Sequence, residues 1–176
     1  MNNRIICVGN LKETYLKDAC AEYLKRLTRY GKTEVIELKE SNSEQECKQM
    51  MQKLGLDSKS DISGKSTKST KPTKSGKSNV ATTPMTRSYI CALDMRGELI
   101  TSDGMAHDIE KLAVSGTSHM TYIIGGSDGL TDELRQHTDK CISFGKITYP
   151  HQLMRVVLLE QLYRWNTIIS GEKYHK

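Results

Sequence analysis

Three short segments hold the residues best placed for chemistry: LDMRG (93–97), IGGSDG (124–129) and FGKITYP (144–150). Each directly follows an apolar, strand-like run, and α/β proteins bind their ligands at the carboxyl ends of such strands. The glycines of the second segment allow a ligand to approach the backbone closely, although a plain structural turn is the alternative. This segment matches neither G-x-G-x-x-G nor a phosphate-binding loop with its Lys and Ser/Thr. Together the three segments predict a pocket without identifying its ligand.

Pro150 and His151 stand where the third segment meets a long apolar stretch. Proline suits the first turn of a helix, because its missing N–H would have no partner there. From His151 to Ser170 the apolar residues leave no wide polar face, so the predicted helix must be covered on more than one side. We therefore expect part of it to form a homodimer interface, and a central helix within one monomer is the alternative.

The charged residues of this helix are Arg155, Glu160 and Arg164, at spacings of five and four residues. Either Glu160 and Arg164 pair at i, i+4, or the charged side chains face a polar site. The chain then ends in GEKYHK, and terminal segments of this kind are usually frayed.

The elements that must position these residues alternate between strand-like and helix-like patterns. Short apolar runs predict strands at 4–8, 34–38, 89–94, 120–126 and 141–144. Helical patterns lie between Leu16 and Leu27, at about 43–55, from Thr101 or Ser102 to near Gly116, near 131–138, and from His151 onward. Strands separated by helices favour a parallel sheet covered on both faces, so we predict one α/β domain with about five strands.

The net charge of +5 is concentrated in one segment. Residues 56–88 hold seven basic and two acidic side chains, so the rest of the chain is neutral overall. Their Ser, Thr, Lys and Gly residues show no apolar periodicity, which predicts a disordered surface insertion in one crossover. Weak contacts with phosphates are the alternative to a solvated linker. The charge therefore does not by itself indicate a nucleic-acid-binding protein.

Five cysteines lie far apart, with no C-x-x-C pair, so neither a zinc site nor a disulfide framework is indicated. We interpret them as reduced core thiols of a cytoplasmic protein. The N-terminal apolar run is too short for a signal peptide, and no stretch approaches the length of a membrane span. Neither a membrane nor a metal is expected to be a partner.

Several longer runs resemble the RlmH family of small SPOUT-class methyltransferases. They are VGNLKETYL (8–16), AEYLKRL (21–27), IIGGSDGL (123–130), PHQLMRVVLLEQLYR (150–164) and the terminal YHK (174–176). The resemblance covers residues 1–55 and 89–176. The Pro-His-Gln-Leu-x-Arg run with a terminal Tyr-His is its specific part, and the glycine loop supports it.

This resemblance implies a single SPOUT-type domain with a C-terminal trefoil knot, interrupted by the insertion, and an obligate homodimer. It also implies methylation, with S-adenosylmethionine, of the N3 position of a pseudouridine in helix 69 of bacterial 23S ribosomal RNA, on assembled ribosomes. The cofactor-binding positions carried over by motif fall on the three segments described first. They are Leu93, Gly125, Phe144, Gly145, Lys146, Ile147, Thr148 and Tyr149.

The acceptor in that reaction is an imide nitrogen, which must lose its proton before or during attack. The candidate catalytic residues are His151, Arg155, Tyr174 and His175. We expect His151 or His175 to accept the proton, and Arg155 to stabilise charge or contact an RNA phosphate. Structural roles are the alternatives, namely helix capping for either histidine and an interface ion pair for Arg155. The match of the terminal YHK suggests that the tail folds over the pocket, across the dimer.

Two departures from the family pattern bear on structure or function. The insertion replaces a short connection, and we treat it as tolerated rather than functional. Trp165 and Asn166 stand where members usually have Ala and then a larger residue, so helix packing or dimer geometry is expected to differ locally. Two other functions stay open: another SPOUT enzyme acting on transfer RNA, and a non-catalytic dimer that binds RNA or a nucleotide.

Overall fold

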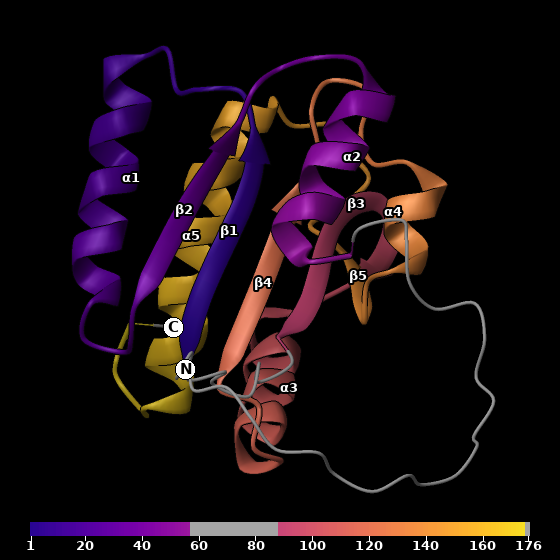
Figure 1. The fold of residues 1–176 in the computed structure, drawn as a ribbon. Helices are drawn as coiled ribbons and strands as arrows, with labels where there is room; N and C mark the ends of the chain where they lie inside the picture. The colour runs from indigo at the N-terminus through magenta and orange to yellow at the C-terminus, as the bar shows by residue number, and fades with distance from the viewer. Residues whose placement is uncertain (57–87, 175–176) are drawn as a thin grey trace, which may run out of the picture.

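The computed structural model describes residues 1–56 and 88–174, in which five strands form one parallel sheet. Figure 1 shows how the strands and helices are arranged. The strands lie in the order β2-β1-β4-β3-β5, and every pair of neighbours is parallel. Their bounds are β1 (Asn2–Val8), β2 (Thr33–Leu38), β3 (Tyr89–Leu99), β4 (His119–Ile124) and β5 (Lys140–Ser143). The predicted α/β class is thus confirmed. The predicted insertion lies, apart from its end residues Leu56 and Ser88, outside the described residues.

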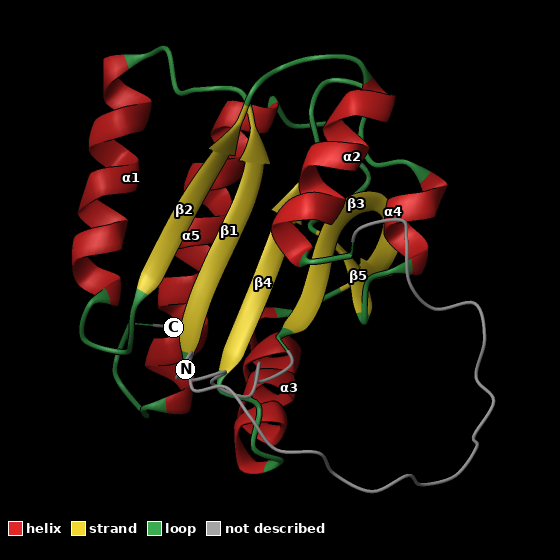
Figure 2. Cartoon of the chain, in the orientation of Figure 1, coloured by secondary structure: helices red, strands yellow, loops and turns green. Residues whose placement is uncertain are grey.

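Helices cover both faces of this sheet (Figure 2). They are α1 (Thr14–Leu27), α2 (Ser43–Leu54), α3 (Ser102–Val114), α4 (Asp132–Gln136) and α5 (His151–Ile169). Alternate residues of β1 separate the two cores, because successive strand side chains point to opposite faces. Ile5 and Cys7 pack in the core shared with α1, α3 and α5, whereas Ile6 and Val8 pack in the core shared with α2 and α4. No helix in the described part of the chain combines the length and apolar character that crossing a membrane requires.

Side-chain caps fix where several helices begin. The hydroxyl of Thr101 accepts a hydrogen bond from the backbone N–H of Gly104 at 3.1 Å, which confirms the start predicted for α3. Thr131 caps α4 in the same way. Helix α5 begins directly after Pro150 without a side-chain cap, as the proline at the junction predicted.

Helix α5 packs against the sheet between α1 and α3. Trp165 is fully buried in that core, with its ring centroid 6.2 Å from that of Tyr122 and 6.3 Å from that of Phe144. The unusual tryptophan is therefore accommodated inside the monomer. One side of α5 is covered by its own chain, while Leu153 and Ile169 stay exposed, and the dimer contact of this helix remains a prediction.

The five cysteines are free, and Cys141 alone is not fully buried. Burial raises the pKa of Cys7 to about 12, and it raises the pKa of Cys91 to about 12 as well. Both thiols are therefore protonated near neutral pH and unreactive, as expected of core thiols.

Strand β3 continues beyond the predicted end of the strand at residue 94. Leu93 and Glu98 both pair with Ile142 of β5, so residues 94–97 leave the ladder and return to it. The return brings Gly97 so close to β5 that an added Cβ would lie 2.7 Å from the backbone nitrogen of Ile142. A loop was predicted here because the segment directly follows an apolar, strand-like run. The structure shows an excursion between two paired parts of one strand, because a glycine permits the second pairing.

We expect Gly97→Ala to lower the free energy of unfolding by about 3 kcal/mol, because the new methyl group meets backbone rather than a movable side chain. Urea denaturation measures this change. Gly116→Ala is the control, since an added Cβ there meets nothing within 4 Å and only its φ of +94° opposes the change. The control should cost about 1 kcal/mol. Equal losses in the two variants would show that β3 and β5 do not approach as described.

Candidate active site

The three segments singled out in the sequence meet around one cavity of about 1180 Å³ at the carboxyl ends of β3, β4 and β5. Such an edge of a parallel sheet is the usual place for a ligand. Of the predicted cofactor-binding residues, those on the cavity wall are Leu93, Gly125, Phe144, Gly145, Ile147, Thr148 and Tyr149. Lys146 is exposed and is not among the wall residues. The structure thus brings the three loops together, and their binding of a cofactor stays a prediction.

The glycine loop after β4 folds back on itself. The backbone N–H of Gly129 donates to the carbonyl oxygen of Gly126 at 3.1 Å. A Cβ on Gly125 would lie 2.8 Å from the carbonyl oxygen of Gly129, so only glycine fits. The loop therefore presents backbone, not side chains, over part of the cavity wall, which suits a ligand that must approach closely.

The loop after β5 is held at its first turn by Ser143, a buried residue that sequence reasoning missed. Its hydroxyl donates to the carbonyl oxygen of Gly145 at 2.8 Å and accepts from the N–H of Gly145 at 3.3 Å. Phe144 packs on Trp165 of the core, whereas Ile147 is 68% exposed. The loop is thus anchored at its base and open at its tip. A polar residue ending an apolar strand run was the available signal.

His151 lies on the cavity wall in the first turn of α5. An added Cβ on Gly9 would come within 3.4 Å of its Nε2, so the imidazole lies beside the end of β1. The neighbouring Gln152 accepts a hydrogen bond from the backbone N–H of Lys12 at 3.0 Å. The connection between β1 and α1 therefore packs against the same helix start.

Arg155 lies one turn further along α5, with only 2% of the residue exposed, and it is not part of the cavity wall. Its guanidinium donates to the carbonyl oxygens of Val8 and Gly9, and it forms a 2.5 Å ion pair with Glu37. These contacts join the start of α5 to the carboxyl ends of β1 and β2. The sequence left open that the charged side chains of this helix face a polar site. Arg155 does not, because its polar partners are backbone carbonyl oxygens and Glu37. Glu160 and Arg164 do pair at i, i+4.

Tyr174 lies far along α5 from the cavity of its own chain. Its hydroxyl donates to Oε1 of Glu160 at 3.3 Å, and its ring meets that of Tyr163 edge-on at 4.8 Å. Burial raises the pKa of Tyr174 to about 12. Glu160 is nine residues beyond His151, or about 14 Å along the helix. Tyr174 and His151, two of the predicted catalytic residues, are therefore apart within one chain. His175 lies outside the described residues.

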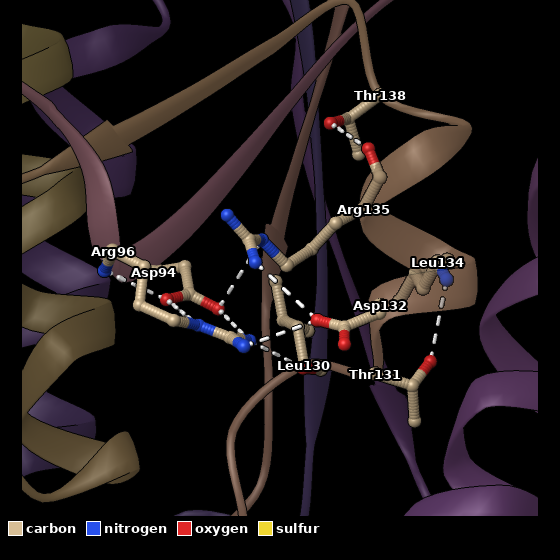
Figure 3. A network of polar contacts seen from close by, with 8 residues as sticks. All are labelled: Asp94, Arg96, Leu130, Thr131, Asp132, Leu134, Arg135 and Thr138. Atoms are coloured by element: carbon tan, nitrogen blue, oxygen red, sulfur yellow. Dashed lines mark hydrogen bonds and ion pairs between the residues drawn. The ribbon is translucent and has the colours of Figure 1, made fainter.

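Four charged residues form a network at the cavity rim (Figure 3). Asp94 accepts hydrogen bonds from the backbone N–H, Nε and Nη2 of Arg96 at 2.8, 3.1 and 3.0 Å. Arg96 also contacts Asp132 at 3.0 Å, and Arg135 reaches both carboxylates. Burial raises the pKa of Asp94, but the hydrogen bonds from Arg96 outweigh burial and lower that pKa below its usual value. The segment 93–97 was predicted as part of the site, but Asp94 and Arg96 were not predicted as a pair. The available signal was two opposite charges, two residues apart, at the end of a strand.

Among residues 1–56 and 88–174, no group of three or more His, Cys, Asp or Glu side chains is arranged to hold a metal ion. What the geometry offers is a cavity of strand-end backbone, one imidazole on its wall and a charged rim. Such a site can bind an organic cofactor and move a proton.

Comparison with known proteins gives this geometry a context. A sequence profile of the family described as predicted SPOUT methyltransferases matches residues 1–175. The chain is 39% identical over 181 aligned residues to the ribosomal RNA large subunit methyltransferase H of Carboxydothermus hydrogenoformans, and 39% identical over 181 to that of Enterococcus faecalis. Both alignments cover all of this chain and all of the relative. A tRNA (m1G37) methyltransferase from Aquifex aeolicus superposes with a TM-score of 0.50 at 10% identity, covering all of this chain and 74% of that one, which shows a shared fold.

We expect Arg155→Met to lower the free energy of unfolding by about 3 kcal/mol, because it leaves two backbone carbonyl oxygens without their buried donor. Glu37→Gln, which keeps an acceptor beside the guanidinium, should cost about 1 kcal/mol. Chemical denaturation followed by circular dichroism measures both. An Arg155→Met protein as stable as the wild type would contradict this structural role and favour contact with a substrate.

Proposed function

The chain belongs to the SPOUT methyltransferase family and, within it, to the RlmH group, and from that premise we propose which atom it methylates. The proposed acceptor is the N3 position of a pseudouridine in helix 69 of 23S ribosomal RNA, on assembled ribosomes in the cytoplasm. S-adenosylmethionine is the proposed donor. The observation that most directly supports this proposal is that the three loops assigned to the cofactor by motif form one cavity, with His151 on its wall. Full-length similarity to ribosomal RNA methyltransferases supports the choice of RNA.

The cavity fits such a cofactor. An added Cβ on Gly129, which lies on the cavity wall, would meet nothing within 4 Å, so the backbone there is open to a ligand such as an adenosyl group. The wall residues that would hold it are Leu93, Gly125, Phe144, Gly145, Ile147, Thr148 and Tyr149, whereas Lys146 is exposed and lies off the wall. When bound, S-adenosylmethionine supplies a methyl group made electrophilic by a sulfonium.

The residues of the chain then have to align the acceptor, remove its proton and exclude water. We assign proton acceptance to His151, the imidazole on the cavity wall. Arg155 is assigned a positioning role, because its guanidinium is occupied by the ends of β1 and by Glu37. By holding the first turns of α5 it fixes the direction of His151. This assignment favours the structural alternative that the sequence left open for Arg155.

The tail is proposed to act on the cavity of a second subunit. Tyr174 packs beside Glu160, about 14 Å along α5 from His151, so a tail of two further residues is badly placed for its own cavity. Exposed apolar side chains of Met95 and Ile147 line the cavity, and Leu153 is exposed in the first turn of α5, so a partner can cover them. The proposed assembly is a homodimer, with the C-terminal trefoil knot that membership of the family implies.

Incubation of ribosomes that lack the modification with protein and S-adenosylmethionine should add one methyl group to helix 69, as measured by mass spectrometry of the excised fragment. His151→Ala should slow the reaction at least about a hundredfold, because a positioned base contributes that much. The variant should retain cofactor binding in calorimetry. If the ribosomes stay unmodified while transfer RNA is methylated under the same conditions, the proposal is overturned in favour of a different substrate.

Deletion of residues 173–176 should abolish methylation while leaving cofactor binding intact. The decisive version mixes two inactive proteins, the deletion variant and His151→Ala, and lets them exchange subunits. If the tail acts across the dimer, one cavity of each mixed dimer has both an intact His151 and an intact partner tail, so activity returns. A mixture that stays inactive, or a deletion variant with unchanged activity, would refute the shared site.

A further inference from the structure

Two walls of the cavity are loops that leave the sheet. Residues 94–97 bulge from β3 between Leu93 and Glu98, which both pair with Ile142. Opposite them lies the connection from β4 to α4, which contains the glycine loop and ends at Leu130 and Thr131. Loops without ladder hydrogen bonds depend on side chains for their relative position.

The side chain of Arg96 joins these two walls (Figure 3). Within its own loop, its Nε and Nη2 donate to the two carboxylate oxygens of Asp94. Across the cavity rim, Nη2 donates to the carbonyl oxygen of Leu130 at 3.0 Å, and Nη1 donates to Asp132 at 3.0 Å. A planar guanidinium with several donors can hold acceptors on two loops at once, which a lysine ammonium cannot reproduce.

Asp94 is the buried end of this contact. Its side chain is only 5% exposed, whereas that of Asp132 is 77% exposed. An exposed ion pair by itself contributes little, so the well-defined geometry must come from the bidentate contact with Asp94. The carboxylate of Asp94 is in turn occupied by three donors of Arg96, with Arg135 3.8 Å away. It is therefore a support for Arg96 and not a free ligand for a bound molecule.

A phosphate-binding role for this cluster is less well supported. Arg96 and Arg135 face Asp94 and Asp132, so the four side chains carry no net charge. Both nitrogens at the tip of Arg96 already donate to acceptors of the protein. RNA would have to displace those contacts before it could use the guanidinium.

We propose that Arg96 is a positioning residue that sets the distance between the β3 and β4 walls of the cofactor cavity. The inference rests on the proposed function, since it takes the occupant of the cavity to be S-adenosylmethionine. Arg96 then governs how tightly the cofactor is held, and it takes no part in proton removal or in binding RNA.

Arg96→Gln should raise the Kd of S-adenosylmethionine, measured by calorimetry without RNA, by about tenfold, because loops that shift by a fraction of an ångström lose alignment. The KM for the cofactor should rise by the same factor, while kcat at saturating cofactor and the KM for ribosomes stay unchanged. Arg96→Lys should resemble Arg96→Gln, since charge without the planar fork does not bridge the loops. Asp132→Asn should give a smaller rise and add nothing to Arg96→Gln.

Arg4→Gln is the matched control. Arg4 has a side chain 47% exposed, against 50% for Arg96, and its ion pair with Glu34 on β1 and β2 is remote from the cavity wall. The control should leave cofactor affinity unchanged, and it should lose less thermal stability than Arg96→Gln, which removes side-chain donors from the buried Asp94 carboxylate. Hydrogen exchange of the cofactor-free protein adds a second readout: residues 93–97 and 124–131 should exchange faster in Arg96→Gln alone.

The outcomes separate this inference from the function on which it rests. Absence of cofactor binding by the wild-type protein overturns the proposed function and the inference together. Normal binding by the wild type with equal binding by Arg96→Gln overturns the inference alone. Recovery of affinity in Arg96→Lys would also refute it in favour of a purely electrostatic contact, and a rise confined to the KM for ribosomes would refute it in favour of RNA binding.

Discussion

The buried guanidinium of Arg155 is the contact on which the geometry of the site depends. A charge taken out of water is costly unless it is paired and its hydrogen bonds are satisfied. Here the partners of Nη1 and Nη2 are the carboxylate of Glu37 and the carbonyl oxygens of Val8 and Gly9, all at the ends of β1 and β2, whereas Nε has no partner among the described residues. Carbonyls at the end of a strand need donors, and the arginine supplies them from a helix. The beginning of α5 is therefore fixed to the sheet edge where the cavity lies.

The cavity follows from that arrangement and from the parallel sheet. Because all five strands point the same way, the loops after β3, β4 and β5 emerge at one edge. The order β2-β1-β4-β3-β5 places the three strands that carry these loops beside one another. The start of α5 closes the remaining side with His151. One sheet edge thus holds the glycine wall, the loop anchored by Ser143 and the imidazole at fixed separations.

The two ends of α5 have different surroundings. Its start meets the cavity, whereas Glu160, midway along it, and Arg164 form a cluster with Tyr163 and with Tyr174, which follows the end of the helix. A long straight helix keeps these two sites apart within one chain. The proposed roles of His151 and of the tail in one reaction therefore require a second copy of the chain, as in the proposed homodimer.

Much of the fold could be predicted from the residues themselves. Apolar runs such as those at 4–8 and 120–126, separated by amphipathic stretches, indicated a parallel sheet covered on both faces, and the cap at Thr101 and the proline before His151 marked helix starts. These signals are local, because they depend on backbone conformation and side-chain alternation over a few residues. The strand-end segments could be selected for the same reason.

The partners across the chain could not be read from the sequence. Arg155 with Glu37 spans 118 residues, and Arg96 with Asp132 spans 36, so the sequence around each arginine does not indicate these distant acceptors. Only the contact of Arg96 with Asp94, two residues away, is local. The second pairing of β3 with β5 likewise depends on how close Gly97 comes to Ile142. The sequence alone determined the element types, the class of fold and the segments that face the site. The tertiary structure decided which charges are buried and which are shared between loops, because hydrogen bonds and burial depend on distances that only the folded chain sets.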